Sequence, residues 1–472
     1  MVFSSIFFIF MFLPAALICY YLVPARFIAV RNVVLLIFSI LFYAWGEPVY
    51  VILMLFSTMC NYFLGLDINH NIKEDRRREA GRTLIFAIVF NLFILGYFKY
   101  AGFLISNLNA ILPVDIPFKE LPLPIGISFY TFQTMSYIID LYRGKVGVQK
   151  SYMRFALYVT MFPQLIAGPI VRYDDVEKQL ADRQYSLTKF GNGAARFIVG
   201  MGKKVFLANN IGVVWTDISA TAPEHLSALA AWIGIIAYTF QIYFDFSGYS
   251  DMAIGLGKMF GFEFLENFNY PYIAKSITEF WRRWHMSLSS WFKEYVYIPL
   301  GGNREGTAKQ IRNILVVWLL TGLWHGAQWT FIAWGVYYGL LLLLEKFVLS
   351  RWQTRWPAFL QHLYCMLFVC IGWVFFASSS IGNAFAYLGA MFGFGGGIAD
   401  GTAVYYLTTN FLLFVILILA SLPIGRRLKQ KFVEVKGRVG VTLAMAGYVV
   451  ILVLTVGYLV TESYNPFLYF RF

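Results

Sequence analysis

Charged side chains are scarce in this sequence of 472 residues, because Asp, Glu, Lys and Arg make up only 13% of it. An ordinary soluble domain has about 25% charged residues. The hydrophobic set instead accounts for 59% of the chain, and 19% of all residues are aromatic. The interior of a water-soluble fold could not hide so many apolar side chains. The composition therefore excludes a soluble globular protein and predicts that a lipid bilayer surrounds most of the chain.

Other absences narrow the possible chemistry. The four cysteines, Cys19, Cys60, Cys365 and Cys370, lie in apolar stretches without the close Cys/His spacing of a zinc site. We therefore predict that they are small buried hydrophobes, and we expect neither a metal nor a bound cofactor. The sequence also lacks a Gly-x-Ser-x-Gly elbow, a P-loop lysine motif and a His-Glu-x-x-His helix. These absences argue against serine-hydrolase, P-loop and zincin chemistry.

Basic residues are in excess, with 38 Lys and Arg against 25 Asp and Glu. Positive loops that face anionic lipid explain this excess more simply than nucleic acid does, so we expect no nucleic-acid partner. The N-terminal stretch has no basic leader region and no small-residue cleavage site. It is therefore predicted to stay as the first membrane helix.

The apolar windows predict an all-α polytopic membrane protein. A membrane helix needs about 20 mostly apolar residues. Six windows meet this requirement: 6–23, 83–99, 226–244, 358–377, 403–422 and 441–460. Glycine and proline interrupt others at 46–48, 122–126 and 163–169, and such breaks are tolerated only where protein or a cavity satisfies the backbone. We predict about 11 to 12 transmembrane helices, together with re-entrant and interfacial helices.

The positive segments predict the topology. We place the basic stretches on the cytoplasmic side: 26–31, 73–82, 143–154, 172–204 and 426–438. Both termini are then extracytoplasmic. We expect one integral-membrane domain over 1–472, and we find no internal repeat of the kind that marks many transporters.

A polar insertion at 258–312 is predicted to be cytoplasmic or interfacial. Its aromatic residues recur at helical spacing, which indicates one amphipathic helix whose tryptophans either anchor in the headgroup region or face a site. The apolar side contains Trp281, Trp284, Leu288, Trp291, Phe292 and Tyr295. His285 shares this side.

His325 is the strongest candidate for chemistry. It lies deep in an apolar segment between Gly322 and Gly326, where an ionisable residue is a functional candidate and glycines allow close approach. A neutral imidazole shielded from water suits the general base of a hydroxyl acyl transfer. A structural histidine between packed helices is the alternative. His285 can converge on the same cavity as a hydrogen-bonding partner or second base.

The remaining polar candidates have simpler explanations. His70 and His225 lie in predicted loops, and His362 is alone in an apolar helix, so we set these three aside. Asp245 and Asp251 form a polar cluster at the end of a membrane helix. For these carboxylates we favour a structural role over one in an active cavity.

Three motifs resemble those of the membrane-bound O-acyltransferase (MBOAT) family. They are FWRRWHMSLS at 280–289, PLGGNR at 299–304 and GLWHG at 322–326. Further matches are LPIGISFYTF at 123–132, FPQLIAGP at 162–169 and YFDFSGYSDMA at 243–253. The resemblance spans nearly the whole chain. It is nearest to the branch that contains the alginate O-acetylation membrane subunit and the polysaccharide and peptidoglycan O-acetyltransferases.

The resemblance implies membrane helices around a central tunnel in the bacterial cytoplasmic (inner) membrane. His325 matches the family's catalytic histidine, and His285 matches a second histidine in a supporting role. The resemblance also implies an acyl thioester donor such as acetyl-CoA, a polysaccharide acceptor outside the membrane and an SGNH-type extracytoplasmic partner. We expect basic residues to attract the donor's phosphates, although each can equally anchor lipid headgroups. These residues are Arg282, Arg283, Lys293 and Arg304.

The aromatic C-terminal motif, 464–472, has two explanations. It can be an interfacial anchor. It also resembles the C-terminal motif of the small membrane partner in teichoic-acid D-alanylation, which implies Tyr469 as an acyl relay. Two other functions stay open for the whole chain: a transporter or flippase that uses the same intramembrane histidine site, and a catalytically silent scaffold.

Overall fold

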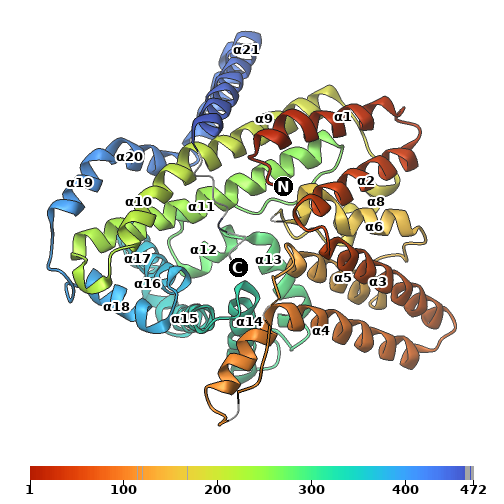
Figure 1. Cartoon of the computed structure of the whole chain (residues 1–472), viewed down its shortest axis with the longest axis horizontal. Helices are drawn as coiled ribbons and strands as arrows, with labels where there is room; N and C mark the ends of the chain where they lie inside the picture. Colours follow the sequence, from red (N-terminus) through yellow and green to blue (C-terminus); the bar gives the residue numbers. More distant parts are fainter. Residues whose placement is uncertain (114, 120, 167, 463–467, 469–472) are drawn as a thin grey trace. The chain divides into compact units, whose positions relative to one another are not determined.

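The computed structural model describes residues 1–472 except 114, 120, 167, 463–467 and 469–472 (Figure 1). The described residues group into two compact units. Unit 1 consists of Met1–Phe197 with Tyr249–Leu265, and unit 2 consists of Ile198–Gly248 with Glu266–Phe472. The prediction of one functional domain over 1–472 stays a prediction.

Unit 1 is built from the first helices of the chain. They are η1 (Phe8–Phe12), α1 (Leu13–Leu22), α2 (Ile28–Gly46), α3 (Tyr50–Lys73), α4 (Arg77–Asn109), α5 (Ile127–Tyr142), α6 (Tyr152–Thr160), α7 (Phe162–Leu165) and α8 (Tyr173–Ala181). The chain leaves unit 1 within α9 (Leu187–Gly202) and returns to it within α11 (Ala228–Met259).

Unit 2 contains the remaining helices. Before α11 these are η2 (Lys203–Asn209), α10 (Asn210–Ser219) and η3 (Pro223–His225). After α11 they are η4 (Pro271–Ile273), α12 (Ile277–Arg283), α13 (Met286–Phe292), η5 (Lys293–Tyr297), α14 (Thr307–His325), α15 (Trp329–Leu344), η6 (Glu345–Leu349), α16 (Ser350–Gln353), α17 (Ala358–Ala377), α18 (Ile381–Met391), α19 (Gly401–Thr409), α20 (Phe411–Ala420) and α21 (Ile424–Thr461).

The described residues include eight helices that are long and apolar enough to cross a membrane, or nine if the bent pair α19 and α20 forms one span. This is fewer than the 11 to 12 predicted from about 20 apolar residues per span. The difference has a physical cause. The helix α5 has only 16 residues, η1 and α1 together form a shorter apolar helix, and α14 begins with polar residues.

A buried polar cluster joins α3, α4 and α5, which pack side by side in unit 1 (Figure 1). The amides of Asn61 and Asn91 exchange hydrogen bonds of 3.1 and 2.7 Å. The hydroxyl of Thr134 donates to Asn91 Oδ1 at 3.1 Å. Polar side chains that pair between membrane helices hold them together where the hydrophobic effect does not.

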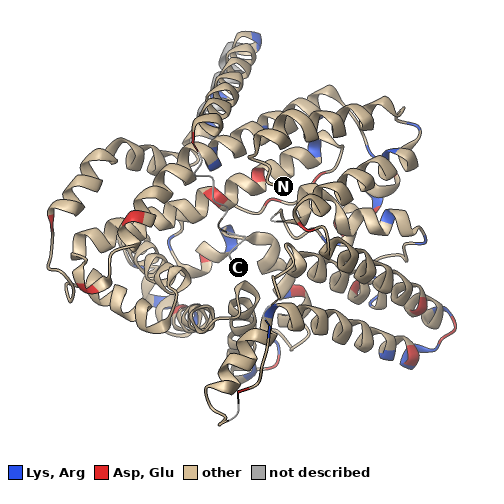
Figure 2. Ribbon diagram, viewed as in Figure 1, with Lys and Arg blue, Asp and Glu red and all other residues tan. Residues whose placement is uncertain are grey.

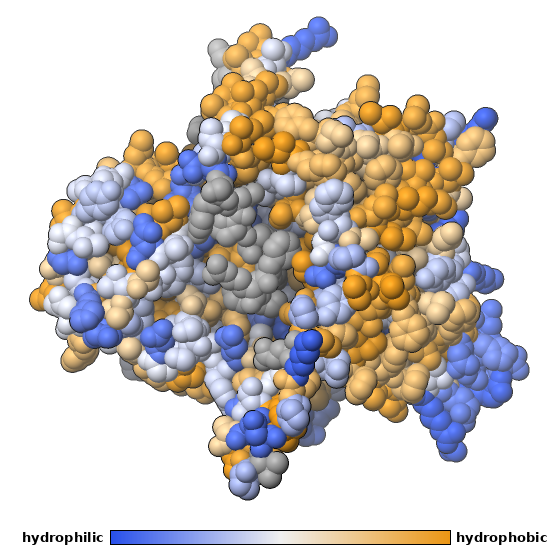
Figure 3. Space-filling view, in the orientation of Figure 1, coloured by the Kyte–Doolittle hydropathy of each residue, from blue (hydrophilic) through white to orange (hydrophobic). Residues whose placement is uncertain are grey.

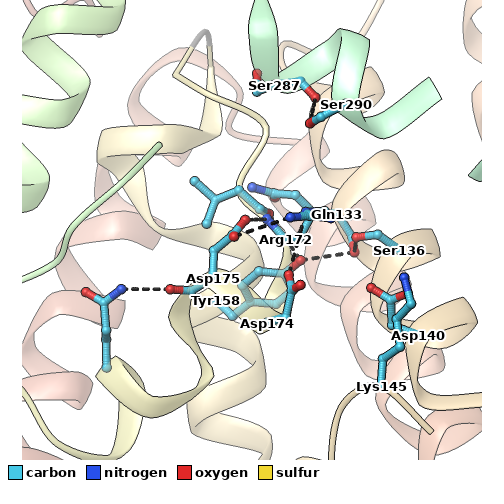
Figure 4. A network of polar contacts seen from close by, with 12 residues as sticks. Gln133, Ser136, Asp140, Lys145, Tyr158, Arg172, Asp174, Asp175, Ser287 and Ser290 are labelled. Carbon is cyan, nitrogen blue, oxygen red and sulfur yellow. Dashed lines mark hydrogen bonds and ion pairs between the residues drawn. The ribbon is translucent and has the colours of Figure 1, made fainter. Parts of the chain in front are cut away.

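The predicted break near Pro163 is present and is buried in unit 1. It separates α6 from α7, and its freed backbone groups find partners: the Phe162 N–H donates to Ser39 Oγ at 3.1 Å, and the Gln164 side chain donates to the Tyr158 carbonyl. The Tyr158 hydroxyl donates to the Gln133 carbonyl at 3.1 Å (Figure 4). The protein itself therefore satisfies the interrupted helix, as the membrane interior requires.

The outer surface of the helices is strongly apolar. Ile85 and Phe93 on α4 and Val453 on α21 are all exposed, and wide apolar areas occupy part of the surface seen in Figure 3, mainly on its right side. Charged residues gather mainly at helix ends and in loops (Figure 2). Such helices fit a lipid environment. The prediction that all four cysteines are buried is confirmed for Cys365 and Cys370, but Cys19 on α1 is exposed and Cys60 on α3 is only half-buried.

Candidate active site

A cavity of about 800 Å³ lies within unit 2 and contains both candidate histidines in its wall. Four stretches of chain line it: residues 275–297, α14, residues 342–354 with the end of α15, η6 and α16, and Gln361 of α17. The lining residues of α14 are Ile314, Val317, Trp318, Thr321 and His325. Their spacing marks one face of a helix, which ends at His325.

His325 is the last residue of α14 and is only 6% exposed. Aromatic rings surround its imidazole, and three of them lie with their centroids within about 5 Å of it. Trp324, Trp334 and Phe376 have centroid distances of 5.0, 5.1 and 5.1 Å and approach edge-on. Such a wall excludes water and fixes the ring, which suits a general base that must act on a hydroxyl without competition from water.

The glycines that flank His325 serve protein packing. A Cβ on Gly322 would lie 2.3 Å from the Phe331 carbonyl oxygen, and one on Gly326 would lie 2.3 Å from the Phe331 ring. These glycines therefore let the start of α15 close tightly on the end of α14, which aims His325 at the cavity. From the sequence, these glycines are expected to allow close approach of another group. In the structure that group is Phe331, through its backbone carbonyl at Gly322 and its ring at Gly326.

His285 interrupts the polar insertion. The prediction of one amphipathic helix is wrong, because the helix stops at Arg283 and restarts at Met286, with His285 in the left-handed region at φ 44° and ψ 52°. This conformation is uncommon for a residue with a Cβ and costs about 1 kcal/mol or more. The break turns the His285 side chain into the cavity wall, where it is 1% exposed.

Asn267 determines which nitrogen of His285 carries a proton. Asn267 Oδ1 accepts from the Ser287 N–H at 3.2 Å and from the Ser287 hydroxyl at 2.9 Å, so this atom is the amide oxygen. His285 Nδ1 lies 3.2 Å from the same oxygen and must therefore donate to it. Nε2 is then the basic nitrogen of the neutral ring. His285 lies outside the candidate spans, and burial lowers its pKa to about 3.

The tryptophans of the insertion are core residues. Trp281, Trp284 and Trp291 are each less than a tenth exposed, so the alternative of a headgroup anchor is wrong for them. Trp324 links the two histidines, with its ring centroid 5.0 Å from that of His325 and 5.8 Å from that of His285. One aromatic side chain therefore contacts both candidate groups.

The structure separates the four predicted donor-binding residues into two pairs. Arg282 and Lys293 line the cavity, and neither has a carboxylate partner among the described residues. Arg283 instead forms an ion pair with Glu279 at 2.8 Å. Arg304 is exposed in the turn after η5 and is not among the cavity-lining residues. Only the first pair is placed to meet an anion in the cavity.

Several cavity residues were missed from the sequence. Lys275 and Lys346 add positive charge to its wall. Glu345, 4% exposed, accepts hydrogen bonds from the backbone N–H groups of Ile277 and Thr278 at 2.6 and 2.8 Å. It therefore caps the first turn of α12. The sequence did give a signal for Glu345, which is a lone carboxylate at the end of the apolar stretch 329–344. Nothing in the sequence indicated a role for Asn267.

The other sequence candidates lie elsewhere. Asp251 forms an ion pair with Arg196 at 2.7 Å in unit 1, and Asp245 forms one with Lys204 at 2.7 Å in unit 2. His362 lies with Nδ1 3.1 Å from the Ala274 carbonyl oxygen, as expected for a structural histidine. Tyr469 lies outside the described residues. Within the described part of the chain, no group of three His, Cys, Asp or Glu side chains is arranged to hold a metal.

Comparison with known proteins gives the family. The model of MBOAT, the membrane-bound O-acyltransferase family, matches residues 126–386, which include both histidines. The probable alginate O-acetylase AlgI of Pseudomonas putida is 42% identical over the full length of both chains, and that of Azotobacter vinelandii is 47% identical over 84% of this chain and 79% of its own. The peptidoglycan O-acetyltransferase of Helicobacter pylori is 35% identical over 84% of this chain and 80% of its own. The chain therefore belongs to the MBOAT family and is a multi-pass membrane acyltransferase.

Proposed function

We propose that this enzyme passes an acetyl group from a cytoplasmic thioester, acetyl-CoA, across the bacterial inner membrane for O-acetylation of an exported cell-envelope polysaccharide. The relatives named as alginate and peptidoglycan O-acetyltransferases support the acetyl group and the polysaccharide acceptor. The observation that carries the proposal is the cavity that His325 and His285 line together with Arg282 and Lys293.

The chemistry of the first step follows from these groups. A hydroxyl attacks the thioester carbon, so a C–O bond forms while the C–S bond breaks. His325 takes the hydroxyl proton as general base and gives it to the departing CoA sulfur as general acid. His285 supports the step as a neutral ring whose orientation Asn267 fixes. In this proposal the attacking hydroxyl is that of Tyr469.

The second step needs a separate protein. We propose that an extracytoplasmic SGNH-type enzyme takes the acetyl group from Tyr469 and transfers it to a sugar hydroxyl. This order requires Tyr469 on the outer side of the membrane. The predicted topology, with both termini extracytoplasmic, meets that requirement.

The proposed function is tested by the fate of acetyl-CoA with the purified protein in liposomes. We expect CoA to be released in a reaction that requires the protein, with the acetyl group retained on protein or passed to an added acceptor. A flippase or transporter would instead move its substrate across the bilayer without any donor. Substrate movement without CoA release would reject the proposal.

The two pairs of basic residues make a matched comparison for donor binding. We expect R282Q/K293Q to raise the KM for acetyl-CoA about tenfold, because each lost contact between a cation and a phosphate costs up to about 1 kcal/mol. This variant should also lose much of the salt dependence of KM. The R283Q/R304Q variant removes the same charge outside the cavity and should leave KM within about twofold. If the two variants raise KM equally, the donor is attracted by the general surface charge and not by contacts in the cavity.

A further inference from the structure

An ion pair lies buried in unit 2, and neither of its residues is among those that line the cavity. Lys204 Nζ and Asp245 Oδ1 are 2.7 Å apart, and their side chains are only 2% and 3% exposed. The two residues belong to the candidate spans Leu187–Ser219 and Ala228–Met259. Charges at membrane depth are expensive and mark functional positions by default.

Two local features bring the pair together. A Cβ on Gly248 would lie 2.7 Å from the Gly200 carbonyl oxygen, so α11 and the end of α9 cross with almost no space between their backbones. Asp245 lies one turn before that crossing. Lys204 lies in η2, a π-helical segment, and such segments often occur at functional sites. Its ammonium also donates to Asn209 Oδ1 at 2.8 Å.

The second oxygen of Asp245 binds the C-terminal part of the chain. Asp245 Oδ2 accepts a hydrogen bond from the backbone N–H of Leu468 at 2.9 Å, across 223 positions of sequence. The Leu468 side chain is buried, at 7% exposure. Leu468 directly precedes Tyr469 in the sequence.

An ion pair kept only for stability does not explain this arrangement. Burying two charges costs several kcal/mol per ion, and well-packed apolar residues of the same volume are often equally stable or more so. A carboxylate supplies what an apolar side chain does not, namely an acceptor for the terminal backbone. Lys204 holds that carboxylate in position through the 2.7 Å ion pair.

We infer that the Lys204–Asp245 pair is a docking site for the C-terminal segment of this chain, and that Asp245 is a positioning residue for Tyr469. The second part rests on the proposed acyl relay, whereas the docking does not. The occupant is this chain's own terminus, because Leu468 is bonded to the site.

Two neutral double variants test the docking. In D245N/K204M the Asn side chain retains an oxygen that accepts from Leu468, and its amide group can donate to Asn209 Oδ1. In D245L/K204M the leucine has nearly the same shape but no acceptor. Both variants lack the buried charges, so they differ in the side-chain amide of residue 245, which supplies the acceptor for the Leu468 N–H in the Asn variant only. Thermal unfolding and gel filtration of both proteins report whether the fold is intact.

Hydrogen exchange at the Leu468 amide is the readout, measured by mass spectrometry of the C-terminal peptide from full-length protein. We expect the D245L/K204M variant to exchange at least about tenfold faster than wild type, and D245N/K204M to stay near wild type. The leucine variant should also lose the acetyl adduct on the terminal peptide. Equal exchange in all three proteins would overturn the docking. The Leu468 amide can exchange as expected in all three proteins while even the wild type gains no acetyl adduct. That result would support the docking and reject the acyl relay.

Discussion

Replacing His325 with alanine should lower the rate of CoA release from acetyl-CoA by about 10²- to 10⁴-fold, the contribution of a positioned general base. The reason lies in its surroundings, where Trp324, Trp334 and Phe376 crowd the imidazole. These side chains offer no group that accepts a proton. His285 does not substitute, because burial lowers its pKa to about 3 and so makes its ring a weak base. The measurement is CoA release by purified enzyme at saturating donor.

His362→Ala is the matched control for this experiment. His362 is also a partly buried histidine of unit 2, but it contacts a backbone carbonyl and is not among the residues that line the cavity. We expect this variant to retain turnover within about twofold of wild type, provided that it folds. A His325→Ala protein with a normal melting temperature and full CoA release would contradict the catalytic assignment.

The sequence predicted which residues lie together in the cavity better than it predicted their local geometry. The apolar surroundings of His325 were readable, and the structure places that side chain in a cavity wall. The helical spacing of the tryptophans near His285 was readable too, but it suggested a continuous helix. Periodicity does not report a single residue in the left-handed region, and that residue is His285 itself.

Contacts between distant residues were beyond the sequence. Asn267 fixes the proton of His285 from 18 positions earlier in the chain, and Lys204 meets Asp245 because glycines allow two helices to cross closely. Each depends on tertiary packing that no local pattern encodes. The same holds for Arg282 and Arg283, adjacent in sequence, of which only the first lines the cavity.

The count of long apolar helices among the described residues is lower than the predicted 11 to 12 spans for a related reason. Hydropathy counts apolar residues and does not distinguish a lipid-facing helix from a short helix buried in protein. The helix α5 is almost entirely buried, with 16 residues. The stretch with α6 and α7 is buried as well. Such segments meet the apolar criterion although the structure does not give them the length of a span.

Replacing Tyr469 with phenylalanine should abolish acetyl transfer to the polymer, with a loss of at least about 10²-fold, because it removes the nucleophilic oxygen and keeps the ring. Wild-type protein incubated with acetyl-CoA should gain the mass of one acetyl group on its C-terminal peptide. The variant should gain none. Intact-mass and peptide analysis of the same samples measures both, and polymer acetylation in cells gives the downstream effect.

Tyr464→Phe supplies the control, because it removes a tyrosine hydroxyl from the same terminal stretch without touching the predicted relay. We expect it to keep both the adduct and polymer acetylation. Comparison with the His325→Ala variant separates the two roles. His325→Ala should prevent the adduct from forming because the base is missing. Tyr469→Phe should also give no adduct, because the hydroxyl to be acetylated is missing although His325 is intact. The opposite outcome is that wild-type protein releases CoA and acetylates an added sugar acceptor with no adduct on Tyr469. In that case the hydroxyl that attacks the thioester belongs to the acceptor itself. The role of the C-terminal motif is then limited to the contact between Leu468 and Asp245.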